Sequence, residues 1–112
     1  VVGRDAEEND RLTLRWAAPD DLWVHVRGAK GSHVVVPTPR GKSVPPDTLI
    51  DAATLAAFYS DARGRPSVEI DYTLAKYVRK PRKAPAGLVT LQQHKTIDLR
   101  IEPKRLDRLL GK

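Results

Sequence analysis

The clearest pattern of hydrophobic and polar positions lies at Leu22–Arg27, where apolar and polar side chains alternate. Alternation with a period of two predicts a half-buried strand. A second strand is predicted at Ser32–Pro37. Gly28 and Gly31 mark a tight connection between the two runs. We therefore expect residues 22–37 to form a hairpin.

A helix is predicted over residues 6–17, because Leu12 and Trp16 stand four positions apart and Asp5 is suited to capping its first turn. A strand over residues 12–16 is the alternative, since Leu12, Leu14 and Trp16 also alternate with polar residues. The helix is the preferred interpretation.

The strongest helix signal begins at a cap of Asp47 or Thr48 and runs to about Ala62, just before Gly64. Its apolar positions are rich in alanine, which permits close packing on a sheet; they include Ile50, Ala53, Leu55, Ala57 and Phe58. A short terminal helix is predicted from Leu106, Leu109 and Leu110.

Further strands are expected at residues 1–2, 68–72, 88–91 and 96–101, and prolines and glycines mark residues 37–46 as an irregular loop. Helices mixed with mainly antiparallel strands define an α+β fold. We expect one domain over residues 1–112, with one principal helix packed on the sheet and short terminal helices.

The composition is that of an ordinary globular chain, with 40% hydrophobic residues in 112. The absence of cysteine excludes disulfides and thiolate metal sites. No apolar run is long enough to cross a membrane, and residues 1–4 do not resemble a signal peptide. We therefore expect a cytoplasmic location. Because methionine is absent, we expect the natural start to lie upstream.

The net charge of +6 points to a polyanionic partner. No acidic residue occurs between Asp21 and Asp47, or from Tyr72 to Ile97. Cations within these acid-free stretches are Arg27, Lys30, Arg40, Lys42, Lys76, Arg79, Lys80, Arg82, Lys83 and Lys95. This segregation predicts one cationic face, and a generic solvated basic surface is the alternative.

Candidate chemistry gathers on the predicted hairpin. Asp21, Trp23 and His25 would point to one face of a strand, where an indole or imidazole offers a flat surface to a base or ribose and Asp21 orients the imidazole. The simpler interpretation is that Trp23 is core and His25 makes a buried hydrogen bond. Across the hairpin, Ser32 and His33 can donate to a phosphate.

Neither a metal site nor catalysis is predicted. His25, His33 and His94 lack the close spacing of zinc ligands. Ser32 with either hairpin histidine lacks the strand–turn–helix elbow of a nucleophilic serine. We expect no cofactor, no small-molecule substrate and no enzymatic activity.

The most concentrated positive charge lies at residues 76–84, where five of nine residues are cationic and Tyr77 adds a ring able to stack on an unpaired base. Pro81 and Pro85 are expected to keep this segment extended along a phosphate backbone. A nuclear-localisation-like tract and a solvated loop are the alternatives.

Several blocks in register resemble the NFACT-R domain family, also called DUF814. They are Gly3-Arg4, Glu8-Asn9-Asp10-x-Leu12-Thr13, Asp21-Leu22-Trp23-Val24-His25, Gly31-Ser32-His33-Val34, Ala52-Ala53-x-Leu55-Ala56-Ala57-x-Tyr59-Ser60, Val68-Glu69-Ile70-Asp71-Tyr72-Thr73, Lys76-x-Val78-Arg79-Lys80-Pro81, Gly87-x-Val89 and Lys95-Thr96-Ile97. The sequence Ala84-Pro85-Ala86-Gly87 departs from the Gly-Ala-x-Pro-Gly more usual in the family.

The resemblance implies an RNA-binding module. Full-length members combine it with an NFACT-N domain, helix-hairpin-helix elements and a coiled coil, and act on the large ribosomal subunit and tRNA in ribosome-associated quality control. The companion elements are not visible here, so a stand-alone bacterial-type member is expected, with tRNA or rRNA as partner in quality control or RNA modification. The alternative function is a protein-interaction module that docks on a ribosomal or tRNA-modification partner.

The predicted RNA contacts lie on or next to the hairpin and in residues 76–84, which we call the basic run. They are Asp21, Trp23, His25, Arg27, Ser32, His33, Lys76, Tyr77, Arg79, Lys80, Arg82 and Lys83. No membrane partner is expected.

Overall fold

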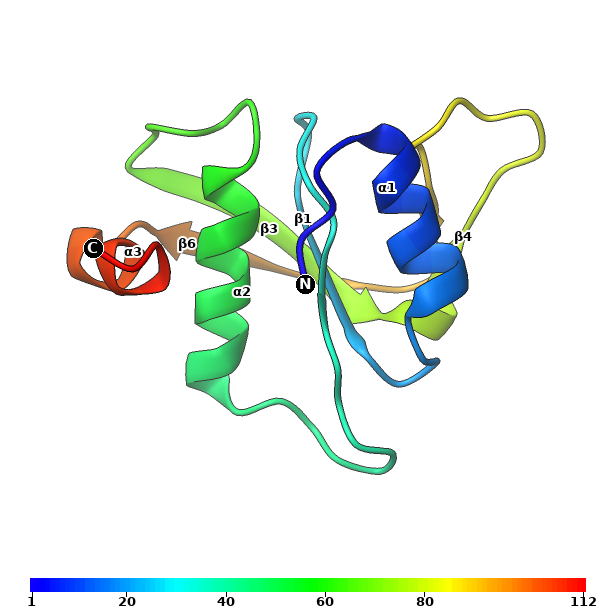
Figure 1. Cartoon of the computed structure of the whole chain (residues 1–112), viewed down its shortest axis with the longest axis horizontal. Coiled ribbons are helices and arrows are strands. Elements are labelled where there is room, and N and C mark those ends of the chain that lie inside the picture. Colours follow the sequence, from blue (N-terminus) through cyan, green and yellow to red (C-terminus); the bar gives the residue numbers. More distant parts are fainter.

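A four-stranded antiparallel sheet in the order β2-β1-β3-β6 forms the centre of the protein (Figure 1). The computed structural model describes residues 1–112. Along the chain the elements are α1 (Ala6–Arg11), η1 (Leu12–Trp16), β1 (Leu22–Val26), β2 (Val34–Val36), α2 (Pro46–Phe58), β3 (Ser67–Leu74), η2 (Ala75–Tyr77), β4 (Val78–Arg79), β5 (Thr90–Leu91), β6 (Lys95–Arg100) and α3 (Pro103–Leu109). The predicted α+β architecture is confirmed.

The register of β1 decides which side chains share a face. β1 pairs with β2 as a hairpin, as predicted, and Trp23 lies opposite Val35 of β2 and Thr73 of β3. One step along the same face, His25 lies opposite Asp71 of β3. Because side chains alternate along a strand, Val24 and Val26 point the other way.

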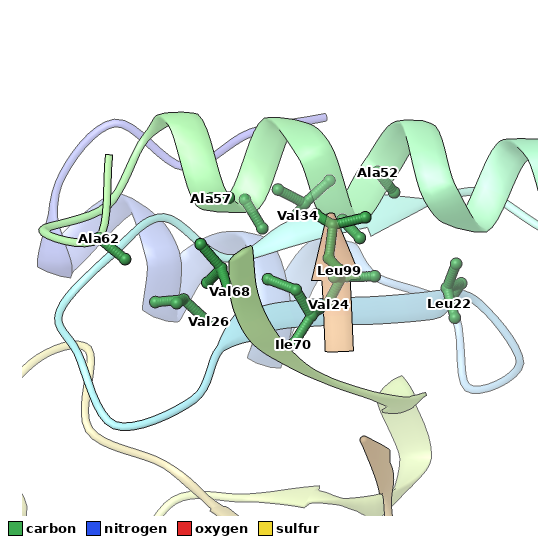
Figure 2. Packing of buried hydrophobic residues seen from close by; sticks show 12 residues of the cluster. Leu22, Val24, Val26, Val34, Ala52, Ala57, Ala62, Val68, Ile70 and Leu99 are labelled. Atoms are coloured by element: carbon green, nitrogen blue, oxygen red, sulfur yellow. The ribbon is translucent and has the colours of Figure 1, made fainter. Parts of the chain in front are cut away.

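Helix α2 covers one face of the sheet. Figure 2 shows alanines of the helix, including Ala52 and Ala57, directed at Val24, Val34 and Leu99 of the strands. Alanine lets the helix backbone approach the sheet closely, as its composition predicts. The cluster contains twelve buried residues and is the larger of the two cores.

A smaller core occupies the opposite face, beneath α1, η1 and the β4–β5 hairpin. Leu12, Trp23, Val35 and Val78 are buried together there. In Figure 1, α1 and α2 lie on either side of β1. The sheet is therefore covered on both faces, and the indole of Trp23 belongs to the second core.

The first helix forms, in preference to a strand over residues 12–16. Asp5 accepts a hydrogen bond from the Glu8 amide at 2.8 Å and caps α1, as predicted. The last turn widens to a π-helix, closed by the Ala17 amide donating to the Leu12 carbonyl at 2.9 Å. This wide turn leaves Trp16 54% exposed.

Both predicted ends of α2 are wrong. The helix begins at Pro46, after Pro45, and neither Asp47 nor Thr48 caps it. Proline suits a first helical position because the amide that it lacks would have no partner there. The helix ends at Phe58 rather than near Ala62.

The segment after α2 leaves the helix because the β1–β2 turn binds it. The Ser32 amide donates to the Tyr59 carbonyl at 2.9 Å, and the Asp61 amide donates to the Lys30 carbonyl at 2.8 Å. Gly31 and Ser60 form a bridge between them, and a Cβ at Gly31 would lie 2.6 Å from Ser60 Cβ. Glycine is therefore required where the two segments meet.

The short C-terminal helix α3 forms as predicted and is attached to α2 by charge. Asp51 of α2 accepts from Arg105 and from Arg108, each at 2.7 Å. None of the helices combines the length and the apolar character needed to cross a membrane.

Candidate nucleic-acid interface

Four chain segments surround an open hollow of about 970 Å³ at one end of the sheet. They are the start of α1, the β1–β2 turn, the segment that follows α2 and the loop between β4 and β5. All four reach the upper edge of the view in Figure 1. Segments distant in sequence therefore meet at one site.

Three aromatic rings form the floor of the hollow. Trp23 and His25 are stacked, with centroids 5.8 Å apart and an interplanar angle of 26°. His33 meets both rings edge-on, at 5.1 Å from Trp23 and 5.4 Å from His25. Trp23 is 2% exposed and His33 is 1% exposed, whereas His25 is partly exposed. All three residues line the hollow, and His25 is the one with appreciable exposed surface.

A buried hydroxyl group holds two of these rings. Trp23 Nε1 donates to Thr13 Oγ1 at 3.0 Å, and the same oxygen lies 2.7 Å from His33 Nδ1. An indole N–H can only donate, so the Thr13 proton is free for Nδ1 when the neutral imidazole carries its own proton on Nε2. Thr13 thus sets the orientation of both rings.

The wall formed by the N-terminal segment is tied to the hairpin by Asn9. Asn9 Oδ1 accepts from the His33 amide at 3.0 Å, and Asn9 Nδ2 donates to the Gly31 carbonyl at 3.3 Å. A Cβ at Gly3 would lie 1.9 Å from Asn9 Oδ1. Glycine at position 3 therefore allows the asparagine to reach the hairpin.

Both histidines of the floor are neutral at physiological pH. Burial, with a smaller contribution from the neighbouring His25, lowers the pKa of His33 to about 4, against the opposing effects of the Gly87 backbone, Asp10 and the Asn9 backbone. Burial also lowers the pKa of His25, against the charge of Asp71 and the backbone of Gly31. The floor is an uncharged aromatic surface.

The charges that line the hollow balance. The cations are Arg4, Lys30 and Arg63, and the carboxylates are Asp5, Asp61 and Asp71. Arg4 is paired with Glu8 at 3.2 Å, and the Arg63 guanidinium lies 3.9 Å from the Phe58 ring centroid. Lys30 makes no ion pair in the structure and is exposed.

The fourth wall is attached to α1 through a lysine and an aspartate. Lys80 Nζ lies 3.0 Å from Asp10 Oδ2 and donates to the carbonyls of Pro85 and Leu88. The other Asp10 oxygen accepts from the Gly87 amide at 3.0 Å. These bonds close residues 81–88 into a loop, which we call the clamped loop.

The basic run is therefore not the extended strip that its prolines predicted. Its first residues form η2 and β4, and the chain then turns, with Lys83 at a φ of 61°. Lys76 pairs with Asp20 at 3.1 Å, and Arg79 donates to the carbonyls of Lys76 and Val78. Arg82 and Lys83 remain exposed and free of ion pairs.

The predicted contact between Asp21 and the imidazole of His25 is wrong. Asp21 lies before β1, is buried, and accepts from the amides of Ala18 and Thr38, each at 2.9 Å. Its role is to join two loops at the far end of the strand. The carboxylate that acts on His25 is Asp71, from the neighbouring strand.

The remaining predicted RNA contacts lie at different places on the protein. Ser32 lines the hollow and is buried, whereas Arg27 donates to Thr96 Oγ1 at 3.2 Å outside it. Tyr77 lines a second, smaller hollow of about 490 Å³, together with Lys42 and Lys95.

The expectation of one continuous cationic face does not hold. Lys30 lines the larger hollow and Lys42 the smaller one, although both belong to the first acid-free stretch. In Figure 1 the loop of residues 37–45 extends from the lower end of the molecule, away from the clamped loop. No set of three His, Asp or Glu side chains is arranged to hold a metal ion.

Comparison with known proteins identifies the family. A family model described as the NFACT protein RNA binding domain matches residues 1–93. The chain belongs to the NFACT-R family. The Rqc2 homolog RqcH of Bacillus subtilis is 41% identical over 99 residues, which cover 87% of this chain and 16% of that protein. The NEMF homolog of Drosophila melanogaster, a ribosome quality control complex subunit, is 38% identical over 62 residues, 55% of this chain and 6% of that protein.

The fold of this NFACT-R domain is also found in a solved structure. The C-terminal part of the fibronectin/fibrinogen-binding protein from Streptococcus suis matches with a TM-score of 0.86 and 32% identity, over 96% of this chain and 43% of that chain. The present chain spans about a sixth of the length of the Bacillus subtilis relative.

Sequence reasoning missed several residues that build the hollow of this NFACT-R domain. Thr13 and Asn9 lie in quoted family blocks, but a single polar residue on a short helix carries no signal of a buried partner far away in sequence. Tyr59 is 44% exposed in the hollow, and it was quoted in a family block without being named as a candidate contact.

Proposed function

We propose that this NFACT-R domain binds tRNA or rRNA in ribosome-associated quality control, with the rim of the larger hollow as its contact surface. The observation that carries the proposal is an aromatic hollow whose lining includes one exposed cation without an ion pair, Lys30, and whose adjoining clamped loop carries two more, in a chain of an RNA-binding family. Relatives of this module are named as Rqc2 homologs and as a ribosome quality control complex subunit. A cytoplasmic location goes with this role.

Three cations are the best candidates for phosphate contacts. Lys30 on the β1–β2 turn, and Arg82 and Lys83 on the clamped loop, are exposed and form no ion pair. Each phosphate that a cation neutralises releases condensed counterions, so the affinity should fall steeply with salt. Lys80, engaged with Asp10, is excluded from this set.

The test is the binding of fluorescently labelled tRNA over a series of salt concentrations. Replacing Arg82 and Lys83 by alanine should weaken binding and reduce the slope of log K against log salt by about two. The matched control replaces Arg100 and Lys104, two exposed cations on β6 and α3, far from the clamped loop in Figure 1. Equal slopes for wild type and the Arg82/Lys83 variant would contradict the proposed contact surface.

A protein-docking role is the second candidate. The smaller hollow has an apolar lining that includes Leu22, Val44 and Leu49, next to the exposed lysines 42 and 95. A docking role would give salt-tolerant binding to a ribosomal protein and no affinity for free tRNA, which the same titration distinguishes.

A further inference from the structure

The composition of the larger hollow favours a neutral ligand group over a charged phosphate. Its three cations are matched in number by three carboxylates, and both floor histidines are neutral because burial lowers their pKa values. A phosphate would gain little electrostatic energy by moving from water into an interior with no net charge. A neutral, flat group with polar edges suits it better.

Apolar surface inside the hollow supports the same conclusion. Tyr59 and Leu88 are 44% and 46% exposed, and they stand on different walls, one after α2 and the other on the loop between β4 and β5. Beneath them the ring of His25 is supported by Trp23. A planar ring that entered here would cover this apolar surface and could stack on an aromatic side chain, as unpaired bases do in RNA-binding proteins.

Polar groups are available for the edge of such a ring. The His25 side chain has a hydrogen bond with the Gly31 backbone and none with another side chain, and the Asp61 carboxylate has no ion-pair partner. A carboxylate accepts from the exocyclic amino groups of bases, and an imidazole can donate or accept. The hollow therefore contains both the stacking surface and the edge contacts that a base requires.

We propose that the larger hollow receives one unpaired nucleobase of the bound RNA, with the base inside and the flanking phosphates on Lys30 and the clamped loop. This inference rests on the proposed RNA-binding function and specifies which part of the RNA is recognised. Bases within a continuous duplex are stacked and paired, and cannot enter. The domain should thus select RNA with an extruded nucleotide over fully paired RNA.

The test uses two RNA hairpins of equal length, one fully paired and one with a single bulged 2-aminopurine. The bulged hairpin should bind about tenfold more tightly, and its fluorescence should change as the base leaves water and stacks. Tyr59→Ala should abolish both the preference and the fluorescence change. The matched control is Trp16→Ala, since Trp16 is 54% exposed and lines neither hollow.

The outcomes separate the two proposals. Equal affinity for both hairpins, with no fluorescence change, would overturn the nucleobase pocket while leaving RNA binding in place. A preference that Tyr59→Ala leaves intact and Trp16→Ala removes would also overturn it, because the base would then stack outside the hollow. No binding of either hairpin at low salt would overturn the proposed function itself.

Discussion

Lys80 Nζ lies 3.0 Å from Asp10 Oδ2, and this contact joins the basic run to α1. Lys80 was one of the cations of residues 76–84 that were predicted to contact RNA, and it instead holds the protein's own loop. The Lys80 side chain is 26% exposed and its partner is 22% exposed, so water screens the pair only in part. The clamped loop and one wall of the hollow depend on it.

Lys80→Ala should therefore act through the loop rather than through charge. Loss of the contact should release the Gly87 amide, which Asp10 now binds, and hydrogen exchange at that amide should accelerate at least tenfold. RNA affinity should fall while the salt slope changes less than in the Arg82→Ala/Lys83→Ala variant. Unchanged exchange at Gly87 in Lys80→Ala would show that the loop does not need this lysine.

The buried imidazole of His33 predicts an acid-sensitive fold. Its pKa is about 4 in the folded protein, against 6.5 for the free group, so the unfolded chain binds more protons between these values. The contribution of the neutral His33 to the free energy of unfolding is fully present above pH 6.5. It is lost as the pH falls toward 4, and it amounts to roughly 3 kcal/mol for a shift of this size.

Urea unfolding at several pH values measures this dependence. His33→Asn keeps a polar atom near the position of Nδ1 but cannot titrate, so its free energy of unfolding should vary less over the same range. His25 also has a lowered pKa and contributes with the same sign, which leaves a smaller residual slope in the variant. Parallel curves for both proteins would contradict a buried, neutral His33.

The Thr13 hydroxyl serves two buried rings, so its removal should be costly. Thr13→Val preserves the shape but leaves Trp23 Nε1 and His33 Nδ1 without their partner. The expected loss is about 1–3 kcal/mol for each buried group left unsatisfied. Thr13→Ser retains the hydroxyl and should lose much less, and equal losses for the two variants would show that packing, not hydrogen bonding, is responsible.

Asp51 should be required for the attachment of α3. It accepts from Arg105 and Arg108, and these hydrogen bonds hold the pKa of its carboxyl below the usual value, against the desolvation that would raise it. Asp51→Asn should destabilise the protein by about 1 kcal/mol, with a smaller effect in high salt. RNA binding should not change, because no residue of α3 lines the larger hollow.

Periodicity was sufficient to predict the strands of the hairpin, both main helices and the α+β class, because each depends on local apolar spacing. It failed at both ends of α2, because the helix begins at Pro46 and because the β1–β2 turn binds Tyr59 and Asp61 through backbone hydrogen bonds just after the helix ends. It failed for Asp21 and Lys80, whose partners lie far away in sequence. A charged residue in a sequence does not show whether its partner will be a ligand or another part of the chain.

The most direct test of the account is an amide chemical-shift titration of the domain with tRNA. We predict that the largest changes map to Arg4, the β1–β2 turn, residues 59–63 and the clamped loop, while the amides of α3 do not move. Changes concentrated on α2 and α3, with the hollow unaffected, would contradict it.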